Sequence, residues 1–270
     1  MLTSRLLWSS MAVTAALALS ACSPSAEEAT DTKANAASAD MAGKTIRIAT
    51  EGAYPPFNYT NADGSLGGYD IEVANALCAQ MQAKCEIVAQ DWDGIIPGLL
   101  AQKYDAVIAG MSITAERQEK VDFTEPYFAN TMVWLTQNDS KFDPNGIKNL
   151  TLGGQRSTTP GAYLQDNYDG KNGNTVKLYD SYDNTYLDLK SGRSDVVLAE
   201  KVSAKSWLSD NPEGFGIVGD EIDNDDNIAI AVRKGDALKD ELNKALTEIR
   251  SSGELALIEQ ANFGQKLANQ

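Results

Sequence analysis

The chain has no histidine among its 270 residues. Every catalytic triad or dyad that depends on an imidazole base is therefore excluded. Cysteine is scarce as well, with three in the whole chain, so a structural zinc site made of cysteine and histidine lacks ligands. We expect no metal and no cofactor.

Basic residues are few compared with acidic ones. The chain has 23 Lys and Arg against 38 Asp and Glu, a net charge of −15 at pH 7. An acidic surface of this kind repels nucleic acid and anionic lipid, so neither is an expected partner. The acidic surface says little about the ligand, because a need for solubility is enough to explain the excess of acidic residues.

A long uninterrupted apolar segment is also missing. The N-terminal stretch Leu6–Ala21 follows a single basic residue, is interrupted by serine and threonine, and is short of the roughly 20 residues that a membrane-spanning helix needs. Residues 1–21 are typical of a secretory signal peptide. The ending Leu-Ser-Ala-Cys resembles the lipobox of bacterial lipoproteins, so we expect a lipid on Cys22; an unmodified cysteine in a discarded peptide is the alternative.

Residues 22–43 lack aromatic residues and apolar periodicity, which predicts a disordered tether behind the lipidated cysteine. The remaining two cysteines, Cys78 and Cys85, are an even pair in an exported chain. We expect a disulfide between them, with two buried thiols as the alternative. The expected location is periplasmic, attached to a membrane only through the lipid.

From Lys44 onward, strand and helix patterns alternate. Helical spacing predicts helices over 71–81 and 238–249, the second stopped by Gly253. Strands are predicted at 45–50, 85–89, 105–109, 131–136, 151–154, 176–179, 195–199 and 227–232. This alternation predicts α/β lobes with mostly parallel sheets flanked by helices.

Two polar, turn-rich stretches, 138–149 and 219–227, flank a self-contained set of these elements. We therefore expect an inserted second lobe at 136–224, with the first lobe formed by 44–135 and 225–270. Ligands of such sheets bind beyond the carboxyl ends of strands, and clefts between lobes are common sites.

One segment predicts what the ligand carries. The run Ala109–Arg117 takes the chain from a predicted strand to a helix start, where backbone N–H groups attract anions. Arg117 can add a charge-assisted, bidentate hydrogen bond to a carboxylate. The plainer alternative is that Thr114 caps the helix and Arg117 is solvated.

Five ordered motifs resemble bacterial periplasmic solute-binding proteins for polar amino acids. They are Thr50–Phe57, Gly68–Ile71, Asp91–Pro97, Gly110–Arg117 and Val121–Thr124. They are most similar to the lysine/arginine/ornithine, arginine, histidine and opine binders, and the resemblance spans roughly residues 44–264. It implies the two-lobed type II periplasmic binding fold with two crossover strands. The implied protein is a monomer that closes over its ligand, delivers it to an ABC permease in the inner membrane, and is not an enzyme.

The resemblance also implies roles for single residues. Arg117, Ser112 and the amide of Thr158 would hold the ligand α-carboxylate, while Gly110 and Glu200 would take the α-ammonium. Tyr54 and Trp92 would be aromatic walls of the side-chain pocket, and Glu51 would receive a cationic side chain. The expected ligand-binding residues are Glu51, Tyr54, Trp92, Ala109, Gly110, Ser112, Arg117, Arg156, Ser157, Thr158 and Glu200.

Counting these charges predicts the type of ligand. A zwitterion satisfies Arg117 and Glu200, which leaves Glu51 as an unpaired carboxylate that costs several kcal/mol if buried. A second positive charge on the ligand would resolve this, with added cation–π attraction from Tyr54 and Trp92. Arginine, lysine and ornithine fit.

Departures from the family pattern widen the range of functions. Arg156 stands where many relatives have glycine; it could pair with Glu200 or Glu51, or meet a second ligand carboxylate, which would suit an opine such as octopine or nopaline. Glu200 is longer than the usual aspartate, and residues 223–227 lack the aromatic-glycine run of many relatives. Two further functions fit the same residues: an enzyme similar to cyclohexadienyl dehydratase, with Glu51 or Glu200 as the acid or base, and a sensor that presents its closed form to a membrane receptor.

Overall fold

The computed structural model describes residues 41–267, with side chains to residue 264. The expected signal peptide, Cys22 and most of the expected tether lie outside the described residues. Residues 41–43, at the end of that tether, form a turn whose Gly43 N–H donates to the carbonyl of Gln82.

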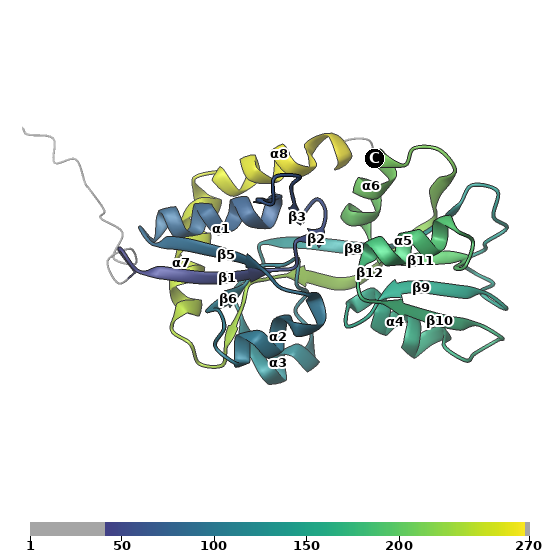
Figure 1. Ribbon diagram of the computed structural model, residues 1–270, viewed down its shortest axis with the longest axis horizontal. Coiled ribbons are helices and arrows are strands. Elements are labelled where there is room, and N and C mark those ends of the chain that lie inside the picture. The colour runs from purple at the N-terminus through teal and green to yellow at the C-terminus, as the bar shows by residue number, and fades with distance from the viewer. Residues whose placement is uncertain (1–40, 268–270) are drawn as a thin grey trace, which may run out of the picture. The chain divides into compact units, whose positions relative to one another are not determined.

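The first lobe is built on a five-stranded sheet with the order β5-β1-β6-β13-β7 (Figure 1). Its strands are β1 (Thr45–Thr50), β5 (Lys84–Ala89), β6 (Ala106–Val107), β7 (Val121–Phe123) and β13 (Ala231–Arg233). A small sheet adds β2 (Ala53–Tyr54), β3 (Asn58–Thr60) and β4 (Leu66–Gly67). The helices of this lobe are α1 (Tyr69–Gln80), α2 (Trp92–Leu100), α3 (Ala115–Lys120), α7 (Leu238–Ser251) and α8 (Glu254–Leu267).

Side chains of β1 alternate between two apolar cores on the two faces of this sheet. Ile46 and Ile48 pack in one core with α1, α7 and α8, and Ala49 packs in the other with α2. In Figure 1, α1 and α8 lie on one side of the sheet and α2 and α3 on the other. The sheet is therefore covered on both faces, as its apolar strands predict.

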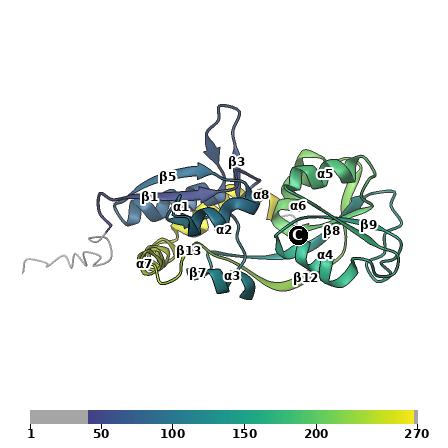
Figure 2. The same ribbon diagram turned by 60° about the horizontal axis from the view of Figure 1, so that its bottom comes forward.

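The second lobe is built on a sheet with the order β10-β9-β11-β8-β12. Its strands are β8 (Phe128–Gln137), β9 (Thr151–Gln155), β10 (Thr175–Tyr179), β11 (Val196–Glu200) and β12 (Phe215–Ile228). Its helices are α4 (Thr159–Tyr168), α5 (Tyr182–Lys190) and α6 (Lys201–Asp210). The turned view in Figure 2 shows these helices around the strands of this lobe.

Both sheets are mixed, where the sequence predicted mostly parallel ones. β1 pairs parallel with β5 and β6, and β9 pairs parallel with β10 and β11. β13 and β8 run antiparallel to the neighbours with which they pair. The reason is the chain path: β8 enters the second lobe and β12 leaves it, paired antiparallel from Gln137↔Phe215 to Phe128↔Ile228.

One sequence expectation is wrong in detail. Residues 219–227 look like a polar turn but lie inside β12, with register shifts between Val218 and Ile222 and between Ile222 and Asp226. β12 is an edge strand, and from Glu221 onward its residues alternate between exposed and less exposed positions. Polar side chains are acceptable on the solvated face, and the backbone bonds to β8 stabilise the strand without apolar periodicity.

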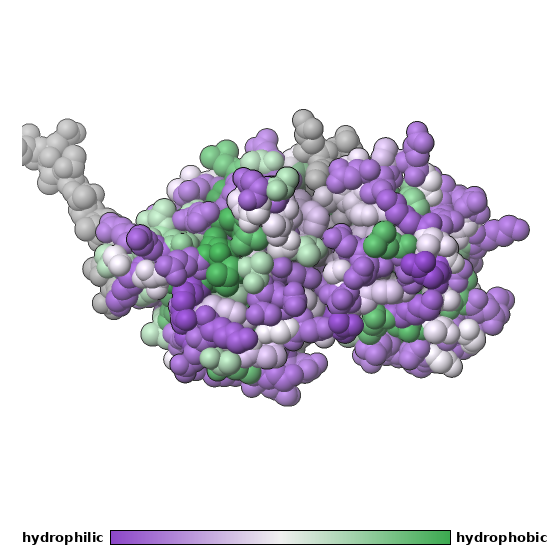
Figure 3. Space-filling model, viewed as in Figure 1, coloured by the Kyte–Doolittle hydropathy of each residue, from purple (hydrophilic) through white to green (hydrophobic). Residues whose placement is uncertain are grey.

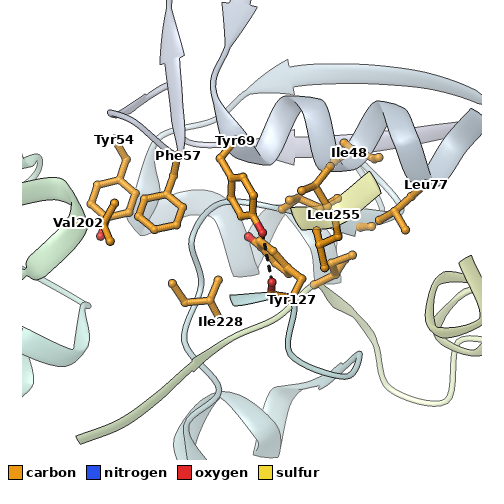
Figure 4. Close-up of a cluster of buried hydrophobic side chains, with 14 of the residues drawn as sticks. Ile48, Tyr54, Phe57, Tyr69, Leu77, Tyr127, Val202, Ile228 and Leu255 are labelled. Carbon is orange, nitrogen blue, oxygen red and sulfur yellow. Dashed lines mark hydrogen bonds between the residues drawn. The ribbon is translucent and has the colours of Figure 1, made fainter. Parts of the chain in front are cut away.

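The buried core where the small sheet meets α1 is rich in aromatic rings (Figure 4). Phe57, Tyr69 and Tyr127 lie together there, and the hydroxyl of Tyr69 donates to the carbonyl of Tyr127 over 3.2 Å. Asp70 is fully buried beneath them and accepts hydrogen bonds from Tyr127 and Asn58. Burial raises the pKa of Asp70 to about 6, against these two hydrogen bonds, which lower it.

A disulfide joins Cys78 on α1 to Cys85 on β5, with an S–S distance of 2.04 Å, and so links the helix to the edge strand. The expected pairing of these two cysteines is therefore present in the structure.

The surface is mostly polar. Hydrophilic side chains cover most of the face shown in Figure 3, with apolar residues gathered over part of the first lobe. Within residues 41–267, every helix is too short or too polar to cross a bilayer.

Candidate functional site

A cavity lies between the lobes at the carboxyl ends of strands from both sheets. Glu51 follows β1, Ala109 and Gly110 follow β6, and Gln155 and Glu200 end β9 and β11. The enclosed space is small, about 10 Å³, so the lobes lie close together around it. The lining residues are Glu51, Tyr54, Trp92, Ala109, Gly110, Ser112, Arg117, Gln155, Thr158, Thr159, Tyr182 and Glu200. The structure therefore brings nine of the eleven predicted ligand-binding residues to one cavity, and Arg156 and Ser157 are the two that do not line it.

Arg117 occupies the first turn of α3, where Thr114 is the N-cap and its hydroxyl accepts from the backbone N–H of Arg117. The plainer alternative predicted that Thr114 caps the helix, and it does. It also predicted a solvated Arg117, but Arg117 is only 9 % exposed. Its guanidinium donates to the carbonyls of Ser112 and Ser157, both over 2.7 Å, and lies 5.2 Å from the ring centroid of Trp92. Burial lowers the pKa of Arg117 from its ordinary value. Hydrogen bonds to neutral carbonyls do not cancel its charge, so the cavity presents a buried cation.

Backbone pairing fixes the segment that carries Ser112. Ser112 bridges Ile228 at the end of β12, and the N–H of Ile113 donates to the carbonyl of Asn227 over 2.8 Å. Gly110 precedes it at φ 56°, in the left-handed region that glycine adopts without strain. A Cβ at this position would lie 2.7 Å from the Tyr54 ring. Gly110 therefore lets the aromatic ring approach the backbone on which Ser112 is held.

Carboxyl groups face the arginine. The Oε1 of Glu51 accepts from the side chain of Gln155 over 2.7 Å, and the Oε2 of Glu200 accepts from the hydroxyl of Tyr182 over 2.6 Å. Burial raises the pKa of Glu51 to about 7, opposed by the hydrogen bond from Gln155. Burial, and next the charge of Asp226, raise the pKa of Glu200 to about 7. With pKa values of about 7, these two carboxyl groups are partly protonated at neutral pH. A cation bound beside them would favour their ionised forms.

Asp226 is a third buried carboxyl group, on β12 behind the cavity lining. Burial raises its pKa, while a hydrogen bond with the side chain of Ser112 and the nearby charge of Arg117 lower it. With Arg117 as the buried cation, three acidic groups therefore surround the site.

The aromatic side chains differ in part from their expected places. The ring of Tyr54 is stacked between Phe57 of its own lobe and Tyr182 of the second lobe, with centroids 5.2 and 5.7 Å away. In Figure 4, Tyr54 points toward Val202 of α6. Trp92 lines the cavity but has its ring over Arg117, and its Nε1 donates to the carbonyl of Ser157. Trp92 thus packs against the protein's own cation rather than standing free as a wall for a ligand cation.

Arg156 and Ser157 do not line this cavity but line a neighbouring one, together with Asp93, Trp92 and Arg117. Arg156 forms an ion pair with Asp93 of α2, and Ser157 donates its hydroxyl to the same carboxylate over 3.1 Å. The expectation that Arg156 could pair with Glu200 or Glu51 is wrong in this structure, because Asp93 of the facing lobe is its partner.

Four residues near the site were not predicted from the sequence: Gln155, Thr159, Tyr182 and Asp226. Gln155 and Thr159 flank the predicted residues 156–158 in the same loop, so the pattern of that loop could have found them. Tyr182 carries a weaker signal, an aromatic residue in the first turn of a helix directly after a strand. Asp226 carries none, because it sits in an acidic run of a kind that is usually solvated.

Two α/β lobes, joined by the antiparallel β8 and β12 and separated by a charged cavity, define a two-lobed periplasmic binding protein. The chain belongs to the bacterial extracellular solute-binding proteins, family 3, whose model matches residues 46–265.

Individual relatives agree with this family. The chain is 37% identical to the ABC transporter arginine-binding protein 1 of Escherichia coli (strain K12) over 229 residues, which cover 83% of this chain and 93% of that protein. It is 36% identical over 221 residues to the octopine-binding periplasmic protein of Rhizobium meliloti, covering 72% and 75%. Among solved structures, an ancestral arginine-binding protein bound to arginine matches with a TM-score of 0.76 and 36% identity, covering 81% of this chain and 98% of that one.

Proposed function

We propose that this protein is the extracytoplasmic substrate-binding component of an ABC importer and binds a cationic L-amino acid, arginine first, between its lobes. The observation that carries the proposal is the charge pattern of the cavity. The guanidinium of Arg117 is bonded to two neutral carbonyls, and it lines the same cavity as the half-buried Glu51 and the buried Glu200. A ligand with one carboxylate and two cationic groups complements this pattern.

Each ligand group has a matching place. The α-carboxylate would meet Arg117 and Ser112 in the first lobe and Thr158 at the N-cap of α4 in the second, where a helix N-terminus favours an anion. The α-ammonium would meet Glu200. The guanidinium of the side chain would meet Glu51, with Gln155 already bonded to that carboxylate.

The mechanism follows from the division of these groups between lobes. A ligand shifts a protein toward a closed form only as far as it binds that form better. Arg117 and Glu51 belong to the first lobe, and Thr158 and Glu200 to the second, so ligand contacts on both sides favour closure. β8 and β12 are the two connections about which the lobes would bend.

The opine alternative receives less support from this site. An opine carries an additional carboxylate and needs a second cation, and the candidate Arg156 already forms an ion pair with Asp93. The enzyme alternative is weaker too, because the arginine- and octopine-binding relatives are binding proteins. Burial explains the raised pKa values of Glu51 and Glu200 without a catalytic role.

We further propose a periplasmic location with a lipid anchor on Cys22 and a permease as the membrane partner. The lipobox-like sequence supports the anchor. The periplasmic and transporter names of the relatives support the location and the partner.

Calorimetric titration of the mature protein tests the ligand. After denaturation and refolding to remove any retained ligand, it is titrated with arginine, lysine, ornithine, glutamine and octopine. We expect arginine to bind with a micromolar or lower Kd, about −8 kcal/mol or better. Binding of octopine alone would replace the proposal by an opine site, and no binding across the panel would reject it.

A further inference from the structure

Ser157, which does not line the cavity that holds Glu51 and Glu200, makes several of the direct contacts between the lobes. Its carbonyl accepts from Arg117 over 2.7 Å and from Trp92 over 3.2 Å. Its hydroxyl donates to Asp93 over 3.1 Å. All three partners belong to the first lobe, whereas Ser157 lies between β9 and α4 of the second. One serine therefore bonds to three first-lobe residues.

The backbone of Ser157 is in an unfavourable conformation. Its φ of 61° lies in the left-handed region, which costs energy for a residue with a Cβ. Such conformations persist where the surroundings hold them. Two of the holding bonds come from Trp92 and Arg117, so the conformation of Ser157 is coupled to the groups that line the ligand cavity.

Asp93 fixes this loop from the opposite side. One carboxylate oxygen accepts the hydroxyl of Ser157, and the other pairs with the guanidinium of Arg156. Asp93 is a position on α2 next to Trp92, so the same turn of helix carries both the ring under Arg117 and the carboxylate that holds the loop. Two adjacent side chains of the second lobe are thus held by a single acidic side chain of the first.

We propose that Asp93 is a positioning residue for the ligand site: by holding Ser157 and Arg156 it keeps the two lobes closed around Arg117 and sets how long a ligand stays bound. This inference rests on the proposed function. Asp93 does not line this cavity, so it acts on the ligand site through Ser157 and Arg156. A role in closure slows release and leaves the encounter rate unchanged, because the bonds between the lobes form after the ligand has entered.

The exposure of the Arg156–Asp93 ion pair sets how much its loss should accelerate ligand release. The side chains of Arg156 and Asp93 are 45 % and 39 % exposed, so their ion pair is screened by salt and modest. Loss of the pair alone should accelerate release about two- to fivefold. Loss of the hydrogen bond to Ser157 as well should bring the acceleration to about tenfold.

The experiment compares four variants of the mature protein. Asp93→Asn keeps an oxygen that can accept from Ser157 and loses the charge, Asp93→Ala loses both contacts, and Arg156→Gln removes the partner cation. Glu119→Gln is the matched control, since it removes an acidic charge from an exposed position on α3 that does not line the cavity. Association and dissociation rates of arginine are measured by stopped-flow at low and high salt, beside thermal unfolding of each variant.

We expect kon to be unchanged in all variants. Dissociation should be about two- to fivefold faster in Asp93→Asn and Arg156→Gln, about tenfold faster in Asp93→Ala, and unchanged in Glu119→Gln. Raising the salt should speed release from the wild type and have little effect on Asp93→Asn and Arg156→Gln. The double variant Asp93→Asn with Arg156→Gln should release arginine no faster than either single one, because one contact is lost in each case.

Several outcomes overturn the inference. Unchanged koff in Asp93→Ala, or a change confined to kon, would show that Asp93 has no part in closure. A change in Asp93→Ala with none in Arg156→Gln, accompanied by a lowered unfolding temperature, would indicate a structural role of α2 instead. If the wild type binds no amino acid at all, the proposed function itself fails, and the inference fails with it.

Discussion

Arg117 is a buried cation whose two guanidinium bonds end on the neutral carbonyls of Ser112 and Ser157. The charges of Glu200 and Asp226 lie near it, but these two bonds are to carbonyls, and an incoming carboxylate would supply a directly bonded counter-charge. We expect Arg117→Ala to weaken the binding of every amino acid by at least 100-fold, whatever the ligand side chain. Calorimetry measures this, with Arg193→Ala, an exposed arginine that does not line the cavity, as the control. Retention of glutamine binding in Arg117→Ala would contradict the carboxylate role.

A change at Glu51 should weaken the binding of cationic amino acids only, because Glu51 is assigned to the ligand side chain. This differs from Arg117, whose loss should weaken the binding of every amino acid. Glu51→Gln preserves shape and removes the charge, so arginine and lysine should lose about 10- to 100-fold in affinity, the worth of a charge-assisted hydrogen bond of about 1.5–3 kcal/mol. Glutamine should lose little. Parallel titrations of the variant decide this, and equal losses for arginine and glutamine would remove Glu51 from the side-chain pocket.

Tyr182 connects the site to pH. Its hydroxyl bond to Glu200 lowers the pKa of that carboxyl, which burial has raised to about 7. Tyr182→Phe should therefore raise the pKa of Glu200 further, leave more of it protonated at pH 7, and weaken arginine binding several-fold. The loss should shrink as the pH is raised to 8.5, where Glu200 ionises again. A loss that is the same at both pH values would mean that the Tyr182 hydroxyl does not act through the ionisation of Glu200.

The resemblance to periplasmic solute-binding proteins, rather than spacing alone, indicated most of these residues. Glu51, Gly110 and Glu200, which the resemblance implied, follow or end strands and line one cavity. The partner of Arg156 was not predictable, since Asp93 meets it across the two lobes, 63 positions away along the chain. The stacking of Trp92 on Arg117 was missed for the same reason: neither residue indicates in sequence which cation the ring will face.

At the scale of elements, the apolar strands and α1 were predictable from periodicity. β1 matches residues 45–50 without a shift, and the helix predicted over 71–81 is α1 at Tyr69–Gln80. Gly253 follows α7 with φ 83°, as a glycine stop predicts. β12 was not predictable as a continuous strand, because its stability comes from pairing with β8 rather than from its own side chains.

The disulfide between α1 and β5 is an element-scale feature with a measurable consequence. It closes a loop of seven residues' separation, for which the chain-entropy relation gives about 2.5 kcal/mol. We expect the double variant Cys78→Ala with Cys85→Ala to lose about that much free energy of unfolding in urea. Arginine affinity should change little, because neither cysteine lines the cavity. A loss below about 0.5 kcal/mol would show that packing of α1 on β5 suffices without the link.

At the scale of the whole molecule, buried carboxyl groups set the pH dependence of stability. The pKa values of Glu51 and Glu200 are raised to about 7 and that of Asp70 to about 6, above the ordinary values of about 4 in an unfolded chain. Between these values the folded state holds protons that the unfolded state has released, so stability falls as the pH rises from about 4 to 7. Carboxyl groups with a lowered pKa, such as Asp105 and Glu221, stabilise the folded state at neutral pH. They lose this contribution to stability only when the pH falls below about 4.

We therefore expect the ligand-free protein to melt several degrees higher at pH 5 than at pH 8. Saturating arginine should reduce or reverse the difference, because a bound cation favours the ionised carboxylates. Differential scanning fluorimetry at the two pH values, with and without arginine, measures both effects. Glu51→Gln should flatten the ligand-free curve, and a ligand-free protein that is more stable at pH 8 would contradict the account.

The sheet orders have a consequence for the order in which the lobes become complete as the exported chain emerges from the membrane, N-terminus first. The second sheet uses strands from one unbroken span, β8 to β12, whereas the first sheet has β13 between β6 and β7. β13 is the last strand of the described residues, and β7 joins the sheet by pairing with it. During this emergence the second lobe can finish its sheet while the first still lacks its interior strand β13, so a chain that ended after residue 228 would have a complete second sheet and an incomplete first one. We expect the lobe that begins first in the sequence to be the last to form.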